Sequence, residues 1–553
     1  MAWFDEAVFY HIYPLGMLGA PKINSYDTPQ HKLPLLIPYL TYIKEAGFNA
    51  LYIGPLFESV GHGYETTDYK KLDSRLGTND DLKLFVEECH KIGLKVIFDG
   101  VFNHTGRDFF AFRDIQKNRE NSPYKNWYSI DFYGNNEYND GFSYKNWGGY
   151  NLLVKLNQQN NEVIDYICDV IRFWVNEFDI DGIRLDAADV LDFNFMQRLR
   201  QTANEVKADF WLMGEVIHGD YNRWANENTL HSVTNYHLHK ALYSGHNDRN
   251  YFEIAHTVKR LWDMSHSLRL YNFVDNHDVE RIYTKLSNKN HFIPIHILLY
   301  TLPGIPSVYY GSEFAVEGKK EKHSDDSLRP EIGFEAYKKQ HEEVPFIRLI
   351  SALGKIRQAS KALAYGDYKE LYLTNRQYAF SRNYENTSVI VTVNCDDSDA
   401  QFSVPCREAS YKGLIFGGNA QIKNGMLYVS IKENSGEIWI SDIEDNNISV
   451  HEIENLTAPE PSNKSEAVAE NTQTEEKTES PAEKIPETKK TDETDFTRIS
   501  VPDIPYEEMS VAQLQAAVLA KLAKNGPVTE QMLKDIRENV YHNSLINWVK
   551  SFR

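Results

Sequence analysis

The sequence predicts an α/β protein whose main domain is a (β/α)8, or TIM, barrel. Eight short apolar segments with the composition of strands lie between residues 7 and 311. Amphipathic helical stretches alternate with them, with apolar residues three and four apart, most clearly at 80–93 and 161–178. A doubly wound sheet is the alternative, but eight strand–helix repeats favour the barrel.

The eight expected strands follow one another along this part of the chain. Each is a run of β-branched, aromatic and other apolar residues that ends in polar or turn-forming residues. They cover residues 7–14, 49–57, 95–103, 182–187, 210–216, 231–236, 271–278 and 304–311. Together with a last helix near 344–359, they place the barrel in residues 1–104 and 151–365.

The connection after the third strand is far too long for a βα loop. Residues 105–150 are rich in Tyr, Trp, Asn and Gly, as in NWYSIDFYGNNEYNDGFSYKNWGGYN. We therefore expect a small inserted subdomain, subdomain B, over the mouth of the barrel.

Three further segments follow the barrel. Residues 366–445 have period-2 patterns such as SVIVTVN and many turn residues, which predicts an antiparallel β-sandwich domain. Residues 446–500 contain few apolar residues and many Glu, Thr, Lys and Pro, which predicts a disordered acidic linker. In residues 501–553, a capping pattern at Ser510 and Gln513 precedes an apolar stripe, which predicts a helical module. A helical hairpin of this size does not easily fold alone, so we expect it to mediate self-association or to dock to a protein partner.

Composition excludes several classes of partner. The formal net charge of −20 argues against a nucleic-acid backbone, whose binders carry a basic surface. The longest apolar run, around residues 293–306, is too short and too interrupted to cross a membrane. The first residues show no signal peptide, so we expect a cytoplasmic protein with reduced thiols at its four cysteines, Cys89, Cys168, Cys395 and Cys406.

A pair of charges stands out in the fourth expected strand, DGIRLDAAD. Arg184 and Asp186 are two residues apart, so their side chains share one face of the strand. Charges near a core must be paired or must serve chemistry. Other expected strands end in polar residues too, and in a barrel these ends meet at one rim. They are Asp99, Asn103 and His104 after the third strand, Glu215 after the fifth, and Asp275, His277 and Asp278 after the seventh.

This set of residues favours one kind of chemistry. Metal-dependent hydrolysis often uses two histidines on one helical face, and phosphate chemistry uses a glycine-rich anion loop. The sequence shows neither pattern. Paired carboxylates with few other nucleophiles suit glycoside hydrolysis, in which one acid attacks the anomeric carbon and the other protonates the leaving oxygen.

The same motifs resemble those of the α-amylase family, glycoside hydrolase family 13. DGVFNH, GIRLDAAD, MGEV and FVDNHD resemble its four signature regions, in the right order. LVKLN (153–157) resembles the motif that closes the family's inserted subdomain, and HGYETTDY (62–69) resembles the segment with its sugar-platform tyrosine. The resemblance covers roughly residues 1–445.

The resemblance implies a role for each of these residues. Asp186 would be the nucleophile, Glu215 the general acid and then the general base, and Asp278 would bind sugar hydroxyls and help to distort the ring. Arg184 would keep Asp186 ionised, because a nearby cation lowers the pKa of a carboxyl group. The substrate-binding residues would be Arg184 together with Tyr64, which stacks on the sugar, and His104, His277 and Asp99.

The resemblance also bears on substrate and cofactor. Ala187 after the nucleophile is typical of members that cleave α-1,4 links, and 153–157 is similar to the motif of neopullulanase-like and cytoplasmic maltodextrin-degrading members. We therefore expect an α-glucan oligosaccharide as substrate. The alternatives are a glucanotransferase, an α-glucosidase acting on α-1,6 links or disaccharides, and a non-catalytic binding homologue. No cofactor is expected to be required. Asn103 matches one position of the family's main calcium site, which leaves calcium as an alternative, while the loop 23–30 lacks a calcium pattern.

Overall fold

The computed structural model of the chain describes residues 2–265, 268–322, 324–333, 336, 339, 346–417, 420–441 and 511–525. These belong to two units, residues 1–461 and residues 462–553. In the second unit the described residues form one helix, α15 (Val511–Asn525), which begins directly after Ser510 as predicted. Leu514 and Val518 of α15 are buried. The expected acidic linker at 446–500 and the rest of the helical module lie outside the described residues.

All eight expected strands are present. They are β1 (Phe9–Ile12), β2 (Ala50–Ile53), β5 (Lys95–Gly100), β11 (Gly182–Leu185), β12 (Trp211–Gly214), β13 (Ser232–Val233), β14 (Tyr271–Phe273) and β15 (Ile305–Tyr309). They form one parallel sheet in the order β13, β12, β11, β5, β2, β1, β15 and β14. A bridge between Thr234 and Tyr271 joins the two ends of the sheet, so it closes into the predicted barrel.

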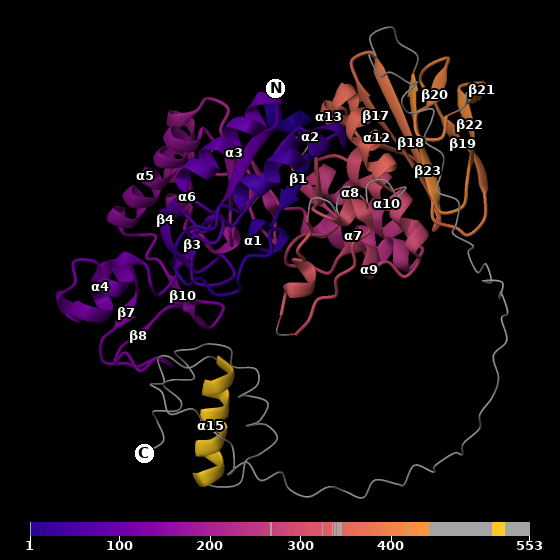
Figure 1. Ribbon diagram of the computed structural model, residues 1–553. Helices are drawn as coiled ribbons and strands as arrows, with labels where there is room; N and C mark the ends of the chain where they lie inside the picture. Colours follow the sequence, from indigo (N-terminus) through magenta and orange to yellow (C-terminus); the bar gives the residue numbers. More distant parts are fainter. Residues whose placement is uncertain are drawn as a thin grey trace, which may run out of the picture. The chain divides into compact units, whose positions relative to one another are not determined.

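Helices cover the outside of the barrel (Figure 1). They are α2 (Ile37–Glu45), α3 (Asn79–Lys91), α5 (Asn161–Phe178), α6 (Phe193–Val206), α7 (Tyr236–Asn247), α8 (Tyr251–Met264), α10 (Phe292–Thr301) and α12 (Phe346–Ala359). The expectation of a helix after every strand is wrong at β12, because only a 3-10 helix, η6 (Tyr221–Arg223), follows it. The connection, residues 215–231, contains several turn-forming Asn, Asp and Gly residues, which favour turns over a full α-helix.

The amino-terminal end of the barrel is filled by large apolar side chains. Phe9 and Trp211 point inward and stack with ring centroids 5.1 Å apart. The 3-10 helix η1 (Trp3–Glu6) covers this end, and its Phe4 stacks on Trp211 at 5.6 Å. This packed core leaves the opposite end, where the strands terminate, for polar chemistry.

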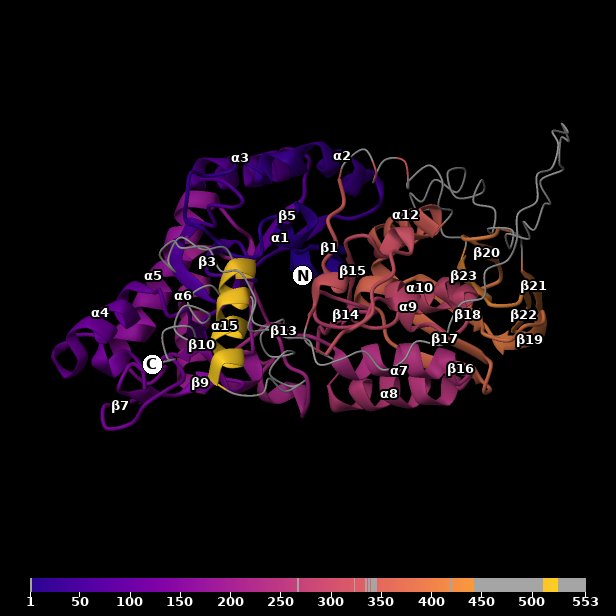
Figure 2. The same cartoon turned by 60° about the horizontal axis from the view of Figure 1, so that its bottom comes forward.

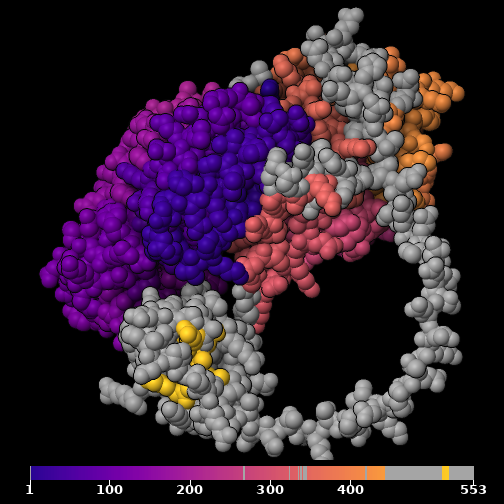
Figure 3. All heavy atoms as spheres, viewed as in Figure 1, coloured from indigo at the N-terminus to yellow at the C-terminus, as the bar shows by residue number. Residues whose placement is uncertain are grey.

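The insertion after β5 has a small sheet and a helix of its own. It contains α4 (Phe110–Asn118) and the short strands β6 (His104–Thr105), β7 (Ile130–Asp131), β8 (Ser143–Tyr144), β9 (Asn146–Trp147) and β10 (Tyr150–Lys155). β10 pairs antiparallel with β6, with Val154 opposite Thr105. The insertion therefore extends through Lys155, beyond the expected boundary at 150. In the space-filling view its purple surface is continuous with the indigo part of the barrel (Figure 3).

The domain after the barrel consists of two antiparallel sheets, as predicted. One contains β16 (Lys369–Leu373), β17 (Gln377–Tyr384), β18 (Thr387–Asn394), β20 (Tyr411–Gly413) and β23 (Ser435–Ser441), and the other β19 (Ala400–Pro405), β21 (Gln421–Lys423) and β22 (Met426–Ile431). Ile390 and Leu427 belong to the apolar core that the two sheets share. On the other face, Val391 and Ile438 join the same core as Ile297 of α10, which lies beside β18 and β23 (Figure 2).

Two smaller expectations concern membranes and cysteines. Among the described helices, none is both long enough and apolar enough to cross a membrane. The four cysteines are unpaired, as predicted, and burial raises the pKa of the Cys89 and Cys168 thiols on α3 and α5.

Candidate active site

Polar side chains that point into the barrel gather at the carboxyl ends of its strands. Trp211 and Met213 of β12 point inward, so Glu215, two residues further on, lies on the same side. On β5, Ile97 points inward and is followed in the same way by Asp99. The alternation of strand side chains thus places the acids in one rim above the apolar core.

Arg184 lies at the centre of this rim and contacts three carboxylates. Its Nη1 donates to Asp99 Oδ1 and to Asp186 Oδ1, both at 2.9 Å. Its Nη2 lies 2.8 Å from Glu215 Oε2. The Arg184 side chain is 3% exposed, so these contacts are shielded from water. A planar guanidinium group with fixed donors therefore sets the relative positions of Asp186 and Glu215.

The pKa of Asp186 reflects both its burial and the charges around it. Burial raises the pKa of Asp186, Arg184 lowers it, and the charges of Glu215 and Asp99 raise it further. The net shift of the pKa is upward. Arg184 acts in the predicted direction, but burial of Asp186, together with the charges of the neighbouring carboxylates, outweighs its effect.

Glu215 accepts hydrogen bonds on both oxygens. The Tyr236 hydroxyl donates to Oε1 at 3.2 Å, and the backbone N–H of Ala187 donates to Oε2 at 3.2 Å. Ala187 has a left-handed backbone (φ 47°), which is uncommon outside glycine, and its N–H lies within hydrogen-bonding distance of Glu215. The chain directly after the expected nucleophile therefore helps to orient the expected acid.

Asp278 sits at the edge of the rim, with a third of its side chain exposed, and pairs with two groups. Arg329 Nη2 donates to Oδ1 at 2.9 Å, and His277 Nε2 lies 3.0 Å from Oδ2. Partial burial opposes ionisation of Asp278, but His277, Arg329 and Arg184 together hold its pKa well below the usual range. Asp278 is thus kept as a carboxylate.

Tyr64 is joined to the rim through its hydroxyl group. The hydroxyl donates to Asp99 Oδ2 at 3.0 Å and also contacts His277 Nε2. The Tyr64 ring lies nearly parallel to the His277 ring, with centroids 5.7 Å apart. Tyr52 of β2 donates to the same Asp99 oxygen at 3.0 Å. Asp99 therefore ties Tyr64 to the centre of the site, and stacking of Tyr64 on a sugar stays a prediction.

His104 directs both ring nitrogens to protein groups. Its Nε2 donates to the carbonyl oxygen of Tyr64 at 3.1 Å, and its Nδ1 accepts from Asn103 Nδ2 at 3.2 Å. Burial lowers the pKa of His104 to about 3, so the ring is neutral at physiological pH. His104 thereby supports the loop that carries Tyr64, and its hydrogen bond to a sugar stays a prediction.

Several residues at this end were not identified from the sequence. His11 points inward from β1 and stacks on Tyr52 with ring centroids 4.1 Å apart. Strand alternation from Phe9 would have found it. Arg329 lies in the long segment after β15, where no local pattern marks it. Its guanidinium group also stacks over the Tyr13 ring at 4.6 Å.

The candidate calcium ligand Asn103 is engaged by the protein itself. Its Oδ1 accepts a hydrogen bond from Gln158 Nε2 at 3.2 Å. In the part of the chain that the structure describes, no group of three or more His, Cys, Asp and Glu side chains is arranged to hold a metal ion.

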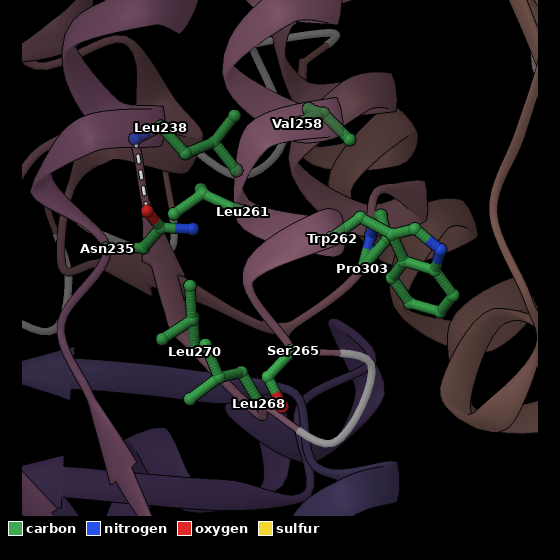
Figure 4. A pocket seen from close by; sticks show the side chains of 9 residues that line it. All are labelled: Asn235, Leu238, Val258, Leu261, Trp262, Ser265, Leu268, Leu270 and Pro303. Carbon is green, nitrogen blue, oxygen red and sulfur yellow. Dashed lines mark hydrogen bonds between the residues drawn. The ribbon is translucent and has the colours of Figure 1, made fainter. Parts of the chain in front are cut away.

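A small pocket away from the rim contrasts with it. It lies between α7, α8 and the start of β14 and has a volume of about 20 Å³, roughly enough for one water molecule. Figure 4 shows that its lining is mainly apolar, with Leu238, Val258 and Leu261 among the residues, while the Asn235 side chain accepts from the Leu238 backbone. No acid points into it, so the rim remains the candidate active site.

Known proteins resemble this chain in both sequence and structure. The family described as the alpha-amylase catalytic domain matches residues 33–346. A cyclomaltodextrinase from Thermoanaerobacter pseudethanolicus is 31% identical over 461 residues, which cover 79% of this chain and 76% of the relative. An intracellular maltogenic amylase from Bacillus subtilis is 26% identical over 419 residues, which cover 71% and 69%. Among solved structures, a debranching enzyme from Nostoc punctiforme superposes with a TM-score of 0.70 at 28% identity, covering 79% of this chain and 99% of that one.

Proposed function

The chain belongs to the alpha-amylase family of glycoside hydrolases, and we propose that it cleaves α-1,4-glucosidic bonds in maltooligosaccharides with retention of configuration. One observation carries this proposal: a single guanidinium group, that of Arg184, contacts Asp186 through one nitrogen and Glu215 through the other. Retaining glycosidases need two carboxyl groups about 5–5.5 Å apart on either side of the scissile bond. A rigid fork that contacts both favours such a spacing.

The reaction proceeds in two displacements. In the first, a carboxylate oxygen of Asp186 attacks the anomeric carbon, the bond to the leaving oxygen breaks, and its electron pair takes the proton that Glu215 donates. In the second, Glu215 removes a proton from water, the water oxygen attacks the anomeric carbon, and the bond to Asp186 breaks. The product keeps the α configuration because the carbon is inverted twice.

Asp278 and Arg329 assist the same reaction from the edge of the rim. The ion pair keeps Asp278 charged, so its free lone pairs accept hydrogen bonds from sugar hydroxyls. Hydroxyl contacts that strengthen as the ring flattens lower the barrier of a glycosidase. Asp278 therefore serves substrate binding and ring distortion.

The backbone after the nucleophile supports the α-1,4 preference. Ala187 adopts φ 47°, a conformation that is strained for β-branched side chains. Valine, the residue typical of α-1,6-cleaving members at this position, would add such strain. The structure therefore favours the small residue that accompanies α-1,4 cleavage.

A time course of maltoheptaose digestion, followed by proton NMR, tests the proposal. We expect wild type to release the α-anomer first and to yield shorter maltooligosaccharides, and Asp186→Asn to release no sugar. Release of the β-anomer would refute retention. Inactivity of wild type on maltoheptaose would refute the substrate.

A second candidate is cleavage of α-1,6 links, since a debranching enzyme superposes on most of this chain. Pullulan and isomaltose in the same NMR assay decide between the two, because α-1,6 cleavage removes a distinct anomeric signal. Products longer than the starting oligosaccharide would instead identify a glucanotransferase. A wild type that binds maltoheptaose without cleaving any of these substrates would be a binding homologue.

We also propose that the enzyme works in the cytoplasm and that residues 501–553 mediate self-association or docking. The first proposal is supported by an intracellular maltogenic amylase among its relatives. The second is supported by the small size of the helical module, which does not easily fold alone. Deletion of residues 446–553 should lower the number of chains per particle, measured by light scattering, or abolish capture of a partner, without loss of activity. An unchanged number of chains and unchanged capture would refute the second proposal. Export of the protein in a fractionated cell would refute the first.

A further inference from the structure

We propose that the carboxamide of Gln158 takes the place of a structural calcium ion and positions the segment that follows the nucleophile. Gln158 follows β10 and precedes α5, between the insertion and the barrel. Its Nε2 donates to Asn103 Oδ1 at 3.2 Å, and its Oε1 accepts from the backbone N–H of Asp192 at 2.7 Å. Asn103 and Gln158 are both buried. One side chain thus bridges two loops of the site.

The donors around Asn103 do not fit a cation. Calcium binds asparagine through the side-chain oxygen. Here the positive hydrogen of the Gln158 amide already occupies that side of Oδ1, and the Asn103 Nδ2 is turned to His104. Lys155, which lies opposite His104 across β6 and β10, adds a positive charge that acts on the His104 ring. A calcium ion at Asn103 would therefore meet amide N–H hydrogens in place of oxygen ligands.

The bridge reaches the catalytic residues through the backbone. Asn103 follows β5 and holds His104, whose ring supports the carbonyl of Tyr64. Asp192 caps α6 by accepting from the Phe195 N–H at 3.1 Å, and it ends the segment that starts at Asp186. Gln158 therefore links the residues that follow β5 to the end of the segment that follows the nucleophile. It touches no reacting atom and is a positioning residue.

A side-chain cation also takes oxygen atoms near the loop 23–30, which lacks a calcium pattern. The Arg75 guanidinium group contacts the backbone just before this loop. Arg75 Nη1 donates to the backbone oxygens of Pro21 (2.9 Å) and Gly61 (2.6 Å), and its Nη2 pairs with Asp73 at 2.7 Å. Backbone oxygens and a carboxylate are ligands that calcium prefers. Here a side-chain cation of the protein takes them.

The first test measures calcium and thermal stability, so it needs no substrate. We expect purified wild type to contain no stoichiometric calcium by mass spectrometry and to melt at the same temperature in excess EDTA or excess CaCl2. Gln158→Glu keeps the acceptor for Asp192 but places a carboxylate oxygen against Asn103 Oδ1. This variant should therefore melt lower in EDTA and regain stability in CaCl2. Gln159→Glu, at the exposed neighbouring position, should show no calcium response.

The second test separates positioning from a merely structural role. Gln158→Ala should lower kcat on maltoheptaose by about tenfold to a hundredfold, the scale of a misplaced catalytic group, with a smaller change in KM. Circular dichroism should show that the variant folds. For Gln158→Glu, calcium should restore kcat as well as melting temperature. The kinetic test rests on the proposed function, whereas the calcium test remains valid even if the proposed function is wrong.

Three results would overturn the inference. One is a wild type that carries one calcium ion per chain and loses stability when EDTA removes it. Another is a Gln158→Glu variant that folds but does not respond to calcium, since the amide would then not occupy a metal position. The third is a Gln158→Ala variant with wild-type melting temperature and kcat.

Discussion

Replacing Glu215 by glutamine should remove proton transfer while leaving the surroundings of the side chain almost intact. Glu215 accepts hydrogen bonds from Arg184 (2.8 Å), the Ala187 N–H (3.2 Å) and the Tyr236 hydroxyl (3.2 Å). The amide oxygen of glutamine can accept from the first two, which share Oε2. The Tyr236 hydroxyl can rotate to accept from the new NH2 group.

The cost in stability is small. Exchanging the charge-assisted hydrogen bond to Arg184 for a neutral one costs about 1 kcal/mol. Unfolding gains about 2.1 cal/mol/K per residue, so roughly 440 residues give about 0.9 kcal/mol/K, and the melting temperature should fall by about 1 °C. Glu215→Gln should therefore be a folded protein whose defect is chemical.

How much activity Glu215→Gln loses depends on the leaving group of the substrate. For maltoheptaose, loss of general acid–base catalysis should lower kcat/KM by roughly 10² to 10⁴, equivalent to about 3–5 kcal/mol of transition-state stabilisation. Fluoride leaves without a proton, so formation of the glycosyl-enzyme from α-maltosyl fluoride should fall far less. The second displacement still lacks its base, so the intermediate should accumulate and give a burst of fluoride.

Reaction with azide distinguishes the nucleophile from the acid/base residue. Azide needs no base, so it should rescue Glu215→Gln and yield α-maltosyl azide by attack on the covalent intermediate. In Asp186→Ala, azide should attack α-maltosyl fluoride directly and yield the β product. Tyr236→Phe, which removes one hydrogen bond to Glu215, should cost less than about tenfold in kcat/KM. Equal losses on maltoheptaose and on the fluoride, or exchanged azide products, would refute the assigned roles.

Three further predictions follow from other contacts. Arg329→Gln should raise the pKa of Asp278, so the acid limb of the pH profile of kcat/KM should move to higher pH; an unmoved limb would mean that the ion pair does not control Asp278. Burial lowers the pKa of His239 to about 4, so below the unfolded value of 6.5 the unfolded chain binds the extra proton and stability falls as pH decreases. Between pH 7 and pH 5, the free energy of unfolding measured in urea should therefore decrease by about 2 kcal/mol less in His239→Phe than in wild type. Replacement of the exposed His256 by glutamine serves as the control and should leave this decrease as it is in wild type. Trp211→Ala should lower the free energy of unfolding by about 3–5 kcal/mol, because Trp211 is fully buried between the rings of Phe4 and Phe9. A decrease below about 1 kcal/mol would show that neighbouring side chains repack to fill the cavity.

The spacing of apolar residues along the sequence made most of the fold predictable. The apolar residues of 161–178 recur at helical spacing, and α5 spans the same residues. All eight strands were found because a barrel strand is buried on both faces and appears as a continuous apolar run. Strand alternation likewise predicted that Arg184 and Asp186 share a face, which their 2.9 Å contact confirms. These features depend on neighbours in sequence.

Features that depend on distant neighbours were not predictable. Arg329 reaches Asp278 from a segment 51 residues away, and nothing local to either residue encodes that contact. The hairpin of β3 (Phe57–Ser59) and β4 (Thr66–Leu72), which presents Tyr64, is stabilised by the buried charges of Asp73 and Arg75 rather than by an alternating pattern. The direction of the Asp186 pKa shift depends on how deeply Asp186 is buried and on which charges surround it, and both are tertiary properties.

Burial of Asp186 and an excess of negative charge around it together explain why Arg184 does not lower the pKa of Asp186 below its usual value. The rim holds four carboxylates and two guanidinium groups: Asp99, Asp186, Glu215 and Asp278 with Arg184 and Arg329. In the free enzyme the carboxylates repel one another, and this repulsion contributes to the raised pKa of Asp186. In the transition state of glycoside hydrolysis the sugar ring gains positive charge. That charge attracts the same carboxylates, so the interaction is stronger in the transition state than in the free enzyme and lowers the barrier. A second arginine beside Asp186 would make the nucleophile easier to ionise, but it would oppose the positive charge on the ring. The excess of negative charge at the rim thus favours the chemical step, while together with burial it opposes the ionisation of Asp186 in the free enzyme.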